Sequence, residues 1–136
     1  MEFTYTNITT DELHGTRLEE FLINIEADIT IADDGRIVFS EGRFPVTELA
    51  RDLTEWATSG NPAPDRDFEW DSMSFAELGA IRIQQREGGW RLGSAYDPEV
   101  WSSSLPWAAL SQAIYEYVKH VRADVEKLGI NPSFIP

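Results

Sequence analysis

In residues 22–32, LINIEADITIA, apolar and polar side chains alternate from Ile23 to Ile31. The apolar positions are the odd-numbered ones, Ile23, Ile25, Ala27, Ile29 and Ile31. A period of two is typical of a strand with one buried face and one solvated face. This segment therefore predicts a half-buried β-strand, which needs other strands beside it and an apolar layer beneath it.

The residues that follow, Asp33-Asp34-Gly35 and then RIVFS, predict that this strand continues into a β-hairpin. If Ile37 and Phe39 join the buried face, Ile31 pairs with Ile37 and the turn contains three residues, 33–35. Gly35 then supplies the left-handed backbone conformation that ends such a turn.

Two later segments repeat their apolar residues every three or four positions, which predicts amphipathic helices. The first covers residues 46–58 and is followed by the connector NPAP. The second covers residues 104–128, with Ser104 as the expected N-cap, Pro106 in its first turn and Gly129 at its end. Its length, at 1.5 Å per residue, is about 36 Å, enough to cross a whole sheet.

Between these helices, residues 66–71, 78–86 and 90–96 are predicted to form further strands. Their expected inner faces contain Phe68, Trp70, Ile81, Ile83, Trp90, Leu92 and Tyr96. The inward positions change from odd to even numbers after Ile83, so pairing Ile83 with Leu92 requires an even loop. The simplest solution is a two-residue turn at 87–88.

These elements predict one α+β domain over residues 1–136. We expect a single antiparallel sheet of about five or six strands, with the 46–58 and 104–128 helices packed on one face. Hairpin groups separated by one helix and followed by another argue against a parallel sheet.

Composition restricts the classes of function. The chain has no cysteine, which excludes disulfides and thiol chemistry, and it has no apolar run of about 20 residues. No signal peptide is visible, so a cytoplasmic protein is expected. The net charge of −13 disfavours nucleic acid and anionic membranes and favours a basic protein partner. The oligomeric state is left open between monomer and homodimer.

The most conspicuous charged segment is DRDFEWD, in which Asp65, Asp67, Glu69 and Asp71 occupy every second position. Neighbours on one strand face lie roughly 6.6 Å apart, too far to hold one ion unaided. A convex strand face also lacks the cleft that a glycosidase carboxylate pair requires. Two interpretations remain. One is a cross-strand charge ladder with Arg82, Arg86 and Arg91, and the other is an acidic recognition surface extended by Glu26, Asp28 and Glu41. Within the segment, we expect Asp65 and Asp67 to contact a partner, because the hairpin arginines should pair with Glu69 and Asp71.

Few other residues suggest chemistry. His120 has Glu116 and Asp124 four positions away on either side, a spacing typical of an exposed helical charge ladder. The chain contains no GxSxG, P-loop, GxGxxG or HExxH motif. We therefore predict no catalytic, metal-binding or cofactor-binding residue. Trp101 and Trp107, which flank SSSLP, are candidates for an exposed aromatic patch that contacts a partner.

The segments FEWDSMSF (68–75) and GGWRLGS (88–94) give the chain a resemblance to a family of small uncharacterised bacterial proteins, frequent in actinobacteria. In that family a D-S-M segment precedes a hairpin ending in G-W-R-x-G-S, and a long helix closes the chain. Such families are similar in style to the immunity proteins of bacterial toxin systems, which are small, acidic, non-enzymatic inhibitors. The resemblance implies a cytoplasmic protein that binds a basic toxin.

Three functional hypotheses follow from the sequence. The first is an acidic protein-binding domain, such as an immunity-type inhibitor. The second is a ligand-binding domain or small enzyme, with a pocket between sheet and helix lined by Trp90, Tyr96 and Trp107. The third is a structural subunit that dimerises through its long helix or an edge strand.

Overall fold

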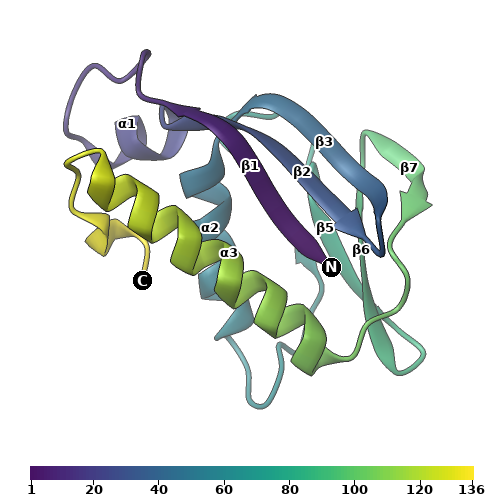
Figure 1. Ribbon diagram of the computed structural model, residues 1–136. Coiled ribbons are helices and arrows are strands. Elements are labelled where there is room, and N and C mark those ends of the chain that lie inside the picture. The colour runs from purple at the N-terminus through teal and green to yellow at the C-terminus, as the bar shows by residue number, and fades with distance from the viewer.

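The computed structural model describes residues 1–136 and has an α+β fold (Figure 1). One antiparallel sheet contains three strands, in the order β1 (Glu2–Thr9), β2 (Glu26–Asp33) and β3 (Arg36–Phe44). The other contains four, in the order β4 (Phe68–Glu69), β5 (Arg82–Arg86), β6 (Gly89–Ser94) and β7 (Asp97–Trp101). The helices are α1 (Leu18–Ile23), α2 (Val46–Ala57), α3 (Trp107–Lys127) and a closing 3₁₀ turn at Pro132–Phe134. None of these helices combines the length and the apolar character that crossing a bilayer requires.

The prediction of a single sheet is wrong, because the strands form two separate hydrogen-bonded ladders. β3 and β6 contact each other without pairing. Polar side chains join the two sheets: the Asp33 carboxylate accepts a hydrogen bond from the Ser103 amide at 2.6 Å, and Arg36 donates to the Trp101 carbonyl. Periodicity shows which face of a strand is buried, but not which strand lies beside it. The sequence therefore did not reveal this division.

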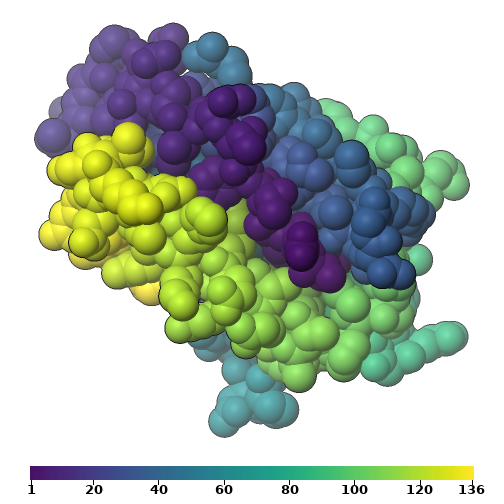
Figure 2. Space-filling model, viewed as in Figure 1, coloured from purple at the N-terminus to yellow at the C-terminus, as the bar shows by residue number.

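Both sheets nevertheless contribute to one apolar core, together with α2 and α3. In Figure 1, α3 runs alongside β1 at the front of the molecule. The space-filling view shows the purple residues of β1 lying directly against the green residues of α3 (Figure 2). The two long helices also pack on each other, and the buried Tyr117 hydroxyl of α3 donates a 2.7 Å hydrogen bond to the Val46 carbonyl at the start of α2.

Four elements were not predicted: β1, α1, β7 and the closing 3₁₀ turn. β1 forms the edge of the first sheet and pairs with β2. The predicted strand 22–32 begins only at Glu26, because residues 18–23 form α1. Helix α1 buries Leu22.

The first hairpin has a tighter turn than predicted. Asp33 pairs with Arg36, so only Asp34 and Gly35 form the turn, with φ values of 53° and 81°. Positive φ at both central residues is the geometry of a type I′ turn, which Asp-Gly suits well. The register then shifts by one residue, so Ile31 pairs with Phe39 and Ile37 pairs with Ala32. As a result, Ile37 is 59% exposed rather than buried.

The second hairpin confirms the prediction. Ile83 pairs with Leu92, and Arg86 pairs with Gly89, which leaves the two-residue turn at 87–88. Trp90 is 3% exposed, as its predicted inward position requires. The prediction for Tyr96 is wrong: β6 ends at Ser94, the chain turns, and the Tyr96 ring is exposed.

The predicted helices agree closely with α2 and α3. Helix α3 begins at Trp107, after Pro106, rather than being capped by Ser104. The reason is that the preceding residue, Leu105, forms a β-bridge with Trp90, which keeps the backbone extended up to Pro106. Gly129 adopts a φ of 84° directly after α3, in the conformation that ends a helix.

Candidate functional site

A groove of about 400 Å³ lies between α2 and the segment around β4. Asp52 and Glu55 line it from α2, and Asp67, Glu69 and Asp71 line it from the β4 segment. Arg66 is the one cation among the lining residues. We call this feature the acidic groove. It brings three of the four carboxylates of the DRDFEWD segment together with two that sequence analysis had not connected to them.

Aromatic side chains form the floor of the acidic groove. Phe68 and Trp70 point inward between the outward carboxylates, as the alternation predicted, and Trp70 is 1% exposed. The Trp70 indole N–H donates a 2.8 Å hydrogen bond to the Asp52 carboxylate. The Trp56 indole N–H donates at 2.9 Å to the Arg66 carbonyl, which fastens the β4 segment to α2.

The predicted charge ladder forms at one position only. Arg86 lies 3.9 Å from Asp67, whose carboxylate also accepts a 2.9 Å hydrogen bond from the Gln85 amide. Arg82 and Arg91 instead place their guanidinium groups 4.5 Å and 4.0 Å from the centre of the Trp101 ring. A guanidinium over an indole face gains a cation–π interaction, so these arginines turn away from the acidic segment.

Consequently three carboxylates of this segment have no cationic partner. No lysine, arginine or histidine nitrogen lies within 4.0 Å of the carboxylates of Asp65, Glu69 or Asp71. All three side chains are exposed. They are therefore available to a cation from outside the chain.

Glu48 of α2 connects the groove wall to the D-S-M segment. Its carboxylate accepts hydrogen bonds from the Ser72 hydroxyl at 2.6 Å and from the Met73 amide at 2.9 Å. Burial raises the pKa of Glu48 in spite of these two hydrogen bonds, and the neighbouring carboxylates Asp52 and Asp71 raise it further. Glu48 thus holds the segment that follows Asp71 in place.

Asp52 lies in a similar environment. Burial raises the pKa of this carboxyl, while the hydrogen bond from Trp70 opposes the shift, and repulsion from Glu55 and Asp71 adds to it. Sequence analysis missed both Glu48 and Asp52. The available signal was their spacing: they lie four residues apart on α2, so they share one side of the helix beside its apolar stripe.

Glu26 and Asp28, the other acidic candidates, lie on β2 and do not line the acidic groove. Glu26 is 3.5 Å from Arg43. Asp28 accepts hydrogen bonds from the Asn7 side chain at 2.9 Å and from the Arg43 amide at 3.1 Å, and the Asn7 bond is the main cause of its lowered pKa. Both carboxylates therefore already have partners within or beside the first sheet.

Trp101 and Trp107 do not form a shared patch. Trp101 lies beneath the two arginines of the second sheet, whereas Trp107 packs against Trp56 and Trp90 at ring distances of 5.6 Å and 5.4 Å. Tyr96 packs on Phe75 instead, so the three aromatics expected to line a pocket between sheet and helix are not gathered there. The tryptophan trio fills this part of the core.

Comparison with protein-family models matches residues 1–127 to a domain of unknown function, DUF7878. The chain belongs to this family. The match extends from β1 to the last residue of α3, so it includes both sheets and the acidic groove. In this DUF7878 protein, Asp71 of the D-S-M segment lines the acidic groove, and Glu48 accepts hydrogen bonds from the two residues that follow it. No curated protein and no solved structure matches the chain.

Proposed function

We propose that this DUF7878 protein is a small, acidic, non-enzymatic protein-binding domain whose acidic groove receives a basic segment of a partner protein. The observation that carries the proposal is the pair of carboxylates without internal cations, Glu69 and Asp71, in a groove that is also lined by the half-buried Asp52. In its finer form, the partner is a basic bacterial toxin and the domain acts as its immunity-type inhibitor.

Electrostatic interactions support this proposal both within the groove and at long range. Near the groove, repulsion between Asp52 and Asp71 is already present in the free protein, so an arriving lysine or arginine relieves it. Farther away, a net charge of −13 attracts a basic partner and increases the rate of encounter.

The structure also changes which carboxylates are the best candidates for contact. Sequence analysis favoured Asp65 and Asp67, on the expectation that arginines of the adjacent hairpin occupy Glu69 and Asp71. Instead, Arg86 and the Gln85 amide engage Asp67, while Glu69 and Asp71 remain without a cation. Asp65 also has no cation, but it does not line the acidic groove. We therefore assign the main contact to Glu69 and Asp71.

The test compares two variants that lose the same charge in different places. Glu69→Gln/Asp71→Asn removes two carboxylates from the acidic groove, and Glu99→Gln/Asp97→Asn removes two exposed carboxylates from β7, outside it. Wild type and both variants are used as bait at low salt in lysate of the source cell. We expect one basic protein to be captured by wild type and by the β7 variant, and to be lost or strongly reduced with the groove variant.

Association kinetics with that captured protein complete the test. The groove variant should associate severalfold more slowly than the β7 variant at low salt, and the two rates should converge at high salt, where the Debye length falls below about 8 Å. Equal capture and equal rates for the two variants would show that the acidic groove has no part in binding.

A further inference from the structure

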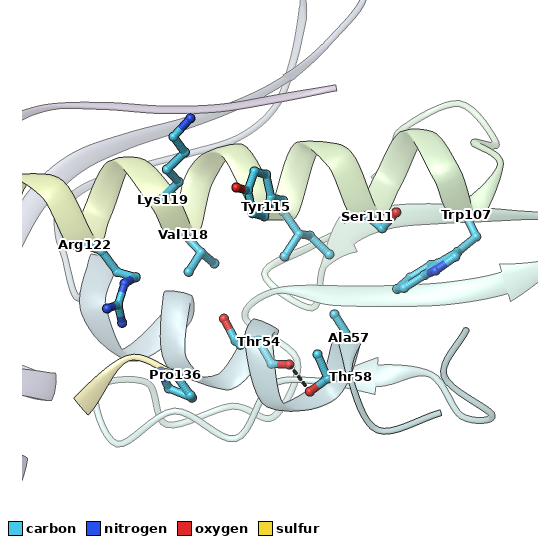
Figure 3. Close-up of a pocket in the computed structure, with 11 residues that line it drawn as sticks. Thr54, Ala57, Thr58, Trp107, Ser111, Tyr115, Val118, Lys119, Arg122 and Pro136 are labelled. Carbon is cyan, nitrogen blue, oxygen red and sulfur yellow. Dashed lines mark hydrogen bonds between the residues drawn. The ribbon is translucent and has the colours of Figure 1, made fainter. Parts of the chain in front are cut away.

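We propose a second, independent binding site: the groove between α2 and α3 binds a small amphiphilic carboxylate, with an apolar body and a single anionic head. This groove has a volume of about 500 Å³ and is drawn in Figure 3. A volume of this size lies within the range of sites for small molecules. We call it the interhelical groove.

The body of the interhelical groove is apolar. Trp107, Ile114 and Val118 line it from α3, and Ala57 faces them from α2 (Figure 3). Two threonines of α2 also line it, but their hydroxyls donate back to carbonyls of their own helix: Thr54 to Ala50 and Thr58 to Thr54, both at 2.8 Å. Their methyl groups are thus left to complete an apolar wall.

The charge of the interhelical groove is opposite to that of the molecule. The chain carries 24 acidic and 11 basic residues, yet the 11 residues that line this groove include Lys119 and Arg122 and no acidic side chain. No carboxylate lies within 4.0 Å of either cation. Figure 3 shows the Lys119 ammonium pointing away from α2, so Arg122 is the cation that faces the groove, and in so acidic a protein its charge favours an anionic occupant.

Arg122 is held in position to receive the anionic head. One of its terminal nitrogens donates hydrogen bonds to the carbonyls of Pro132, at 3.0 Å, and Ile135, and this fixes the half-buried side chain against the C-terminal segment. Figure 3 shows Arg122 pointing from α3 toward α2 at one end of the groove, with Trp107 at the other end. The head group therefore belongs at the Arg122 end, and the apolar body extends along Val118 and Ile114 toward Trp107.

The acidic groove has none of these properties, since carboxylates line it and its occupant is a cation. The two proposals can therefore fail separately. A ligand of the interhelical groove is bound by helix side chains that the Glu69→Gln/Asp71→Asn variant leaves untouched.

The experiment uses dodecanoate below its micelle concentration, with dodecanol as the uncharged analogue, in titration calorimetry with the full chain. We expect dodecanoate to bind with a stoichiometry of one and more tightly than dodecanol. Arg122→Gln should weaken dodecanoate binding by about two- to fivefold, as expected for one partly exposed ion pair, and leave dodecanol binding unchanged. Lys119→Gln, whose head group points away from α2, should have a smaller effect than Arg122→Gln. Ala57→Leu should weaken both ligands by more than tenfold, because it fills the groove. Lys127→Gln, at the exposed end of α3 outside the groove, is the matched control and should change neither.

Three results would overturn the proposal: no binding of dodecanoate, equal affinities for dodecanoate and dodecanol, or equal losses in Lys127→Gln and Arg122→Gln. A fourth would assign the groove to another occupant: if Ala57→Leu converts a dimer into a monomer in sedimentation and wild type does not bind dodecanoate, a second copy of the chain covers the interhelical groove. Circular dichroism of each variant confirms that it is folded, and unchanged dodecanol binding by Arg122→Gln shows that loss of the Arg122 contacts has not loosened the groove.

Discussion

Glu48 is 2% exposed, and its carboxylate accepts two hydrogen bonds from the D-S-M segment. Because its pKa is raised in the folded protein, the folded state binds this proton more tightly than the unfolded chain does. The resulting stabilisation is fully present below the ordinary pKa of 4.5 and is lost as the pH rises through the folded pKa. Replacing Glu48 by a neutral side chain removes this dependence.

We predict that Glu48→Gln keeps the protonated arrangement at all pH values, since its amide can donate to Ser72 and accept from Met73. The free energy of unfolding of wild type, minus that of Glu48→Gln, should fall as the pH rises from 4.5 toward 7. Urea unfolding at a series of pH values measures this difference, with Glu126→Gln on the exposed side of α3 as the control. A difference that stays constant or grows with pH would contradict a raised pKa of Glu48 in the folded protein.

At the scale of elements, the two hairpin turns have the same geometry and different residues. Both use positive φ at two successive positions: 53° and 81° at Asp34-Gly35, and 36° and 83° at Glu87-Gly88. Aspartate tolerates the left-handed conformation better than glutamate, because its short polar side chain can hydrogen-bond locally. The second turn is therefore the less favourable of the two.

Glu87→Asn should raise the free energy of unfolding by about 0.5–1 kcal/mol, since Asn-Gly is a preferred pair for this turn. Asp34→Asn, the same replacement residue in the first turn, should change it by less. Denaturant unfolding of both variants provides the comparison. An equal change in both, or a loss of stability in Glu87→Asn, would show that turn conformation does not limit the second hairpin.

Elements differ in how far their own sequence predicts them. The apolar stripes of α2 and α3 repeat along a continuous helix, so they were recognised within a few residues of their bounds. β4 contains only residues 68 and 69, although alternation predicted a strand over 66–71. Apolar and polar side chains also alternate where an extended segment packs on the core without pairing with another strand. Trp70 is such a residue, so the alternation overestimated the length of the paired strand.

At the scale of the whole molecule, Trp90 contacts several of the elements that form the core. It lies on β6, its ring is 5.4 Å from those of Trp56 of α2 and Trp107 of α3, and its backbone pairs with Leu105. The core cluster that contains it also includes side chains of the first sheet. Loss of the Trp90 ring should therefore destabilise the whole fold.

We predict that Trp90→Ala lowers the free energy of unfolding by about 3–5 kcal/mol, the usual range for a buried aromatic side chain. The two sheets should still unfold together, because they share one core. Circular dichroism and tryptophan fluorescence should accordingly give coincident transitions in both wild type and variant. A loss below about 1 kcal/mol, or separate transitions for the two probes, would contradict the shared core.

The sequence by itself determined the α+β class, the two long helices, the second hairpin with its two-residue turn, and the burial of Trp70 and Trp90. Each of these features depends on residues that are close together in the sequence. Within such a segment, the spacing of apolar residues shows directly which face of the helix or strand is buried. The tertiary structure alone decided the division into two sheets, the meeting of Asp52 with Asp71, and the turn of Arg82 and Arg91 toward Trp101. These depend on side chains far apart in sequence competing for the same partners in space. No periodicity records the outcome of that competition, which in this protein leaves Glu69 and Asp71 without a cation.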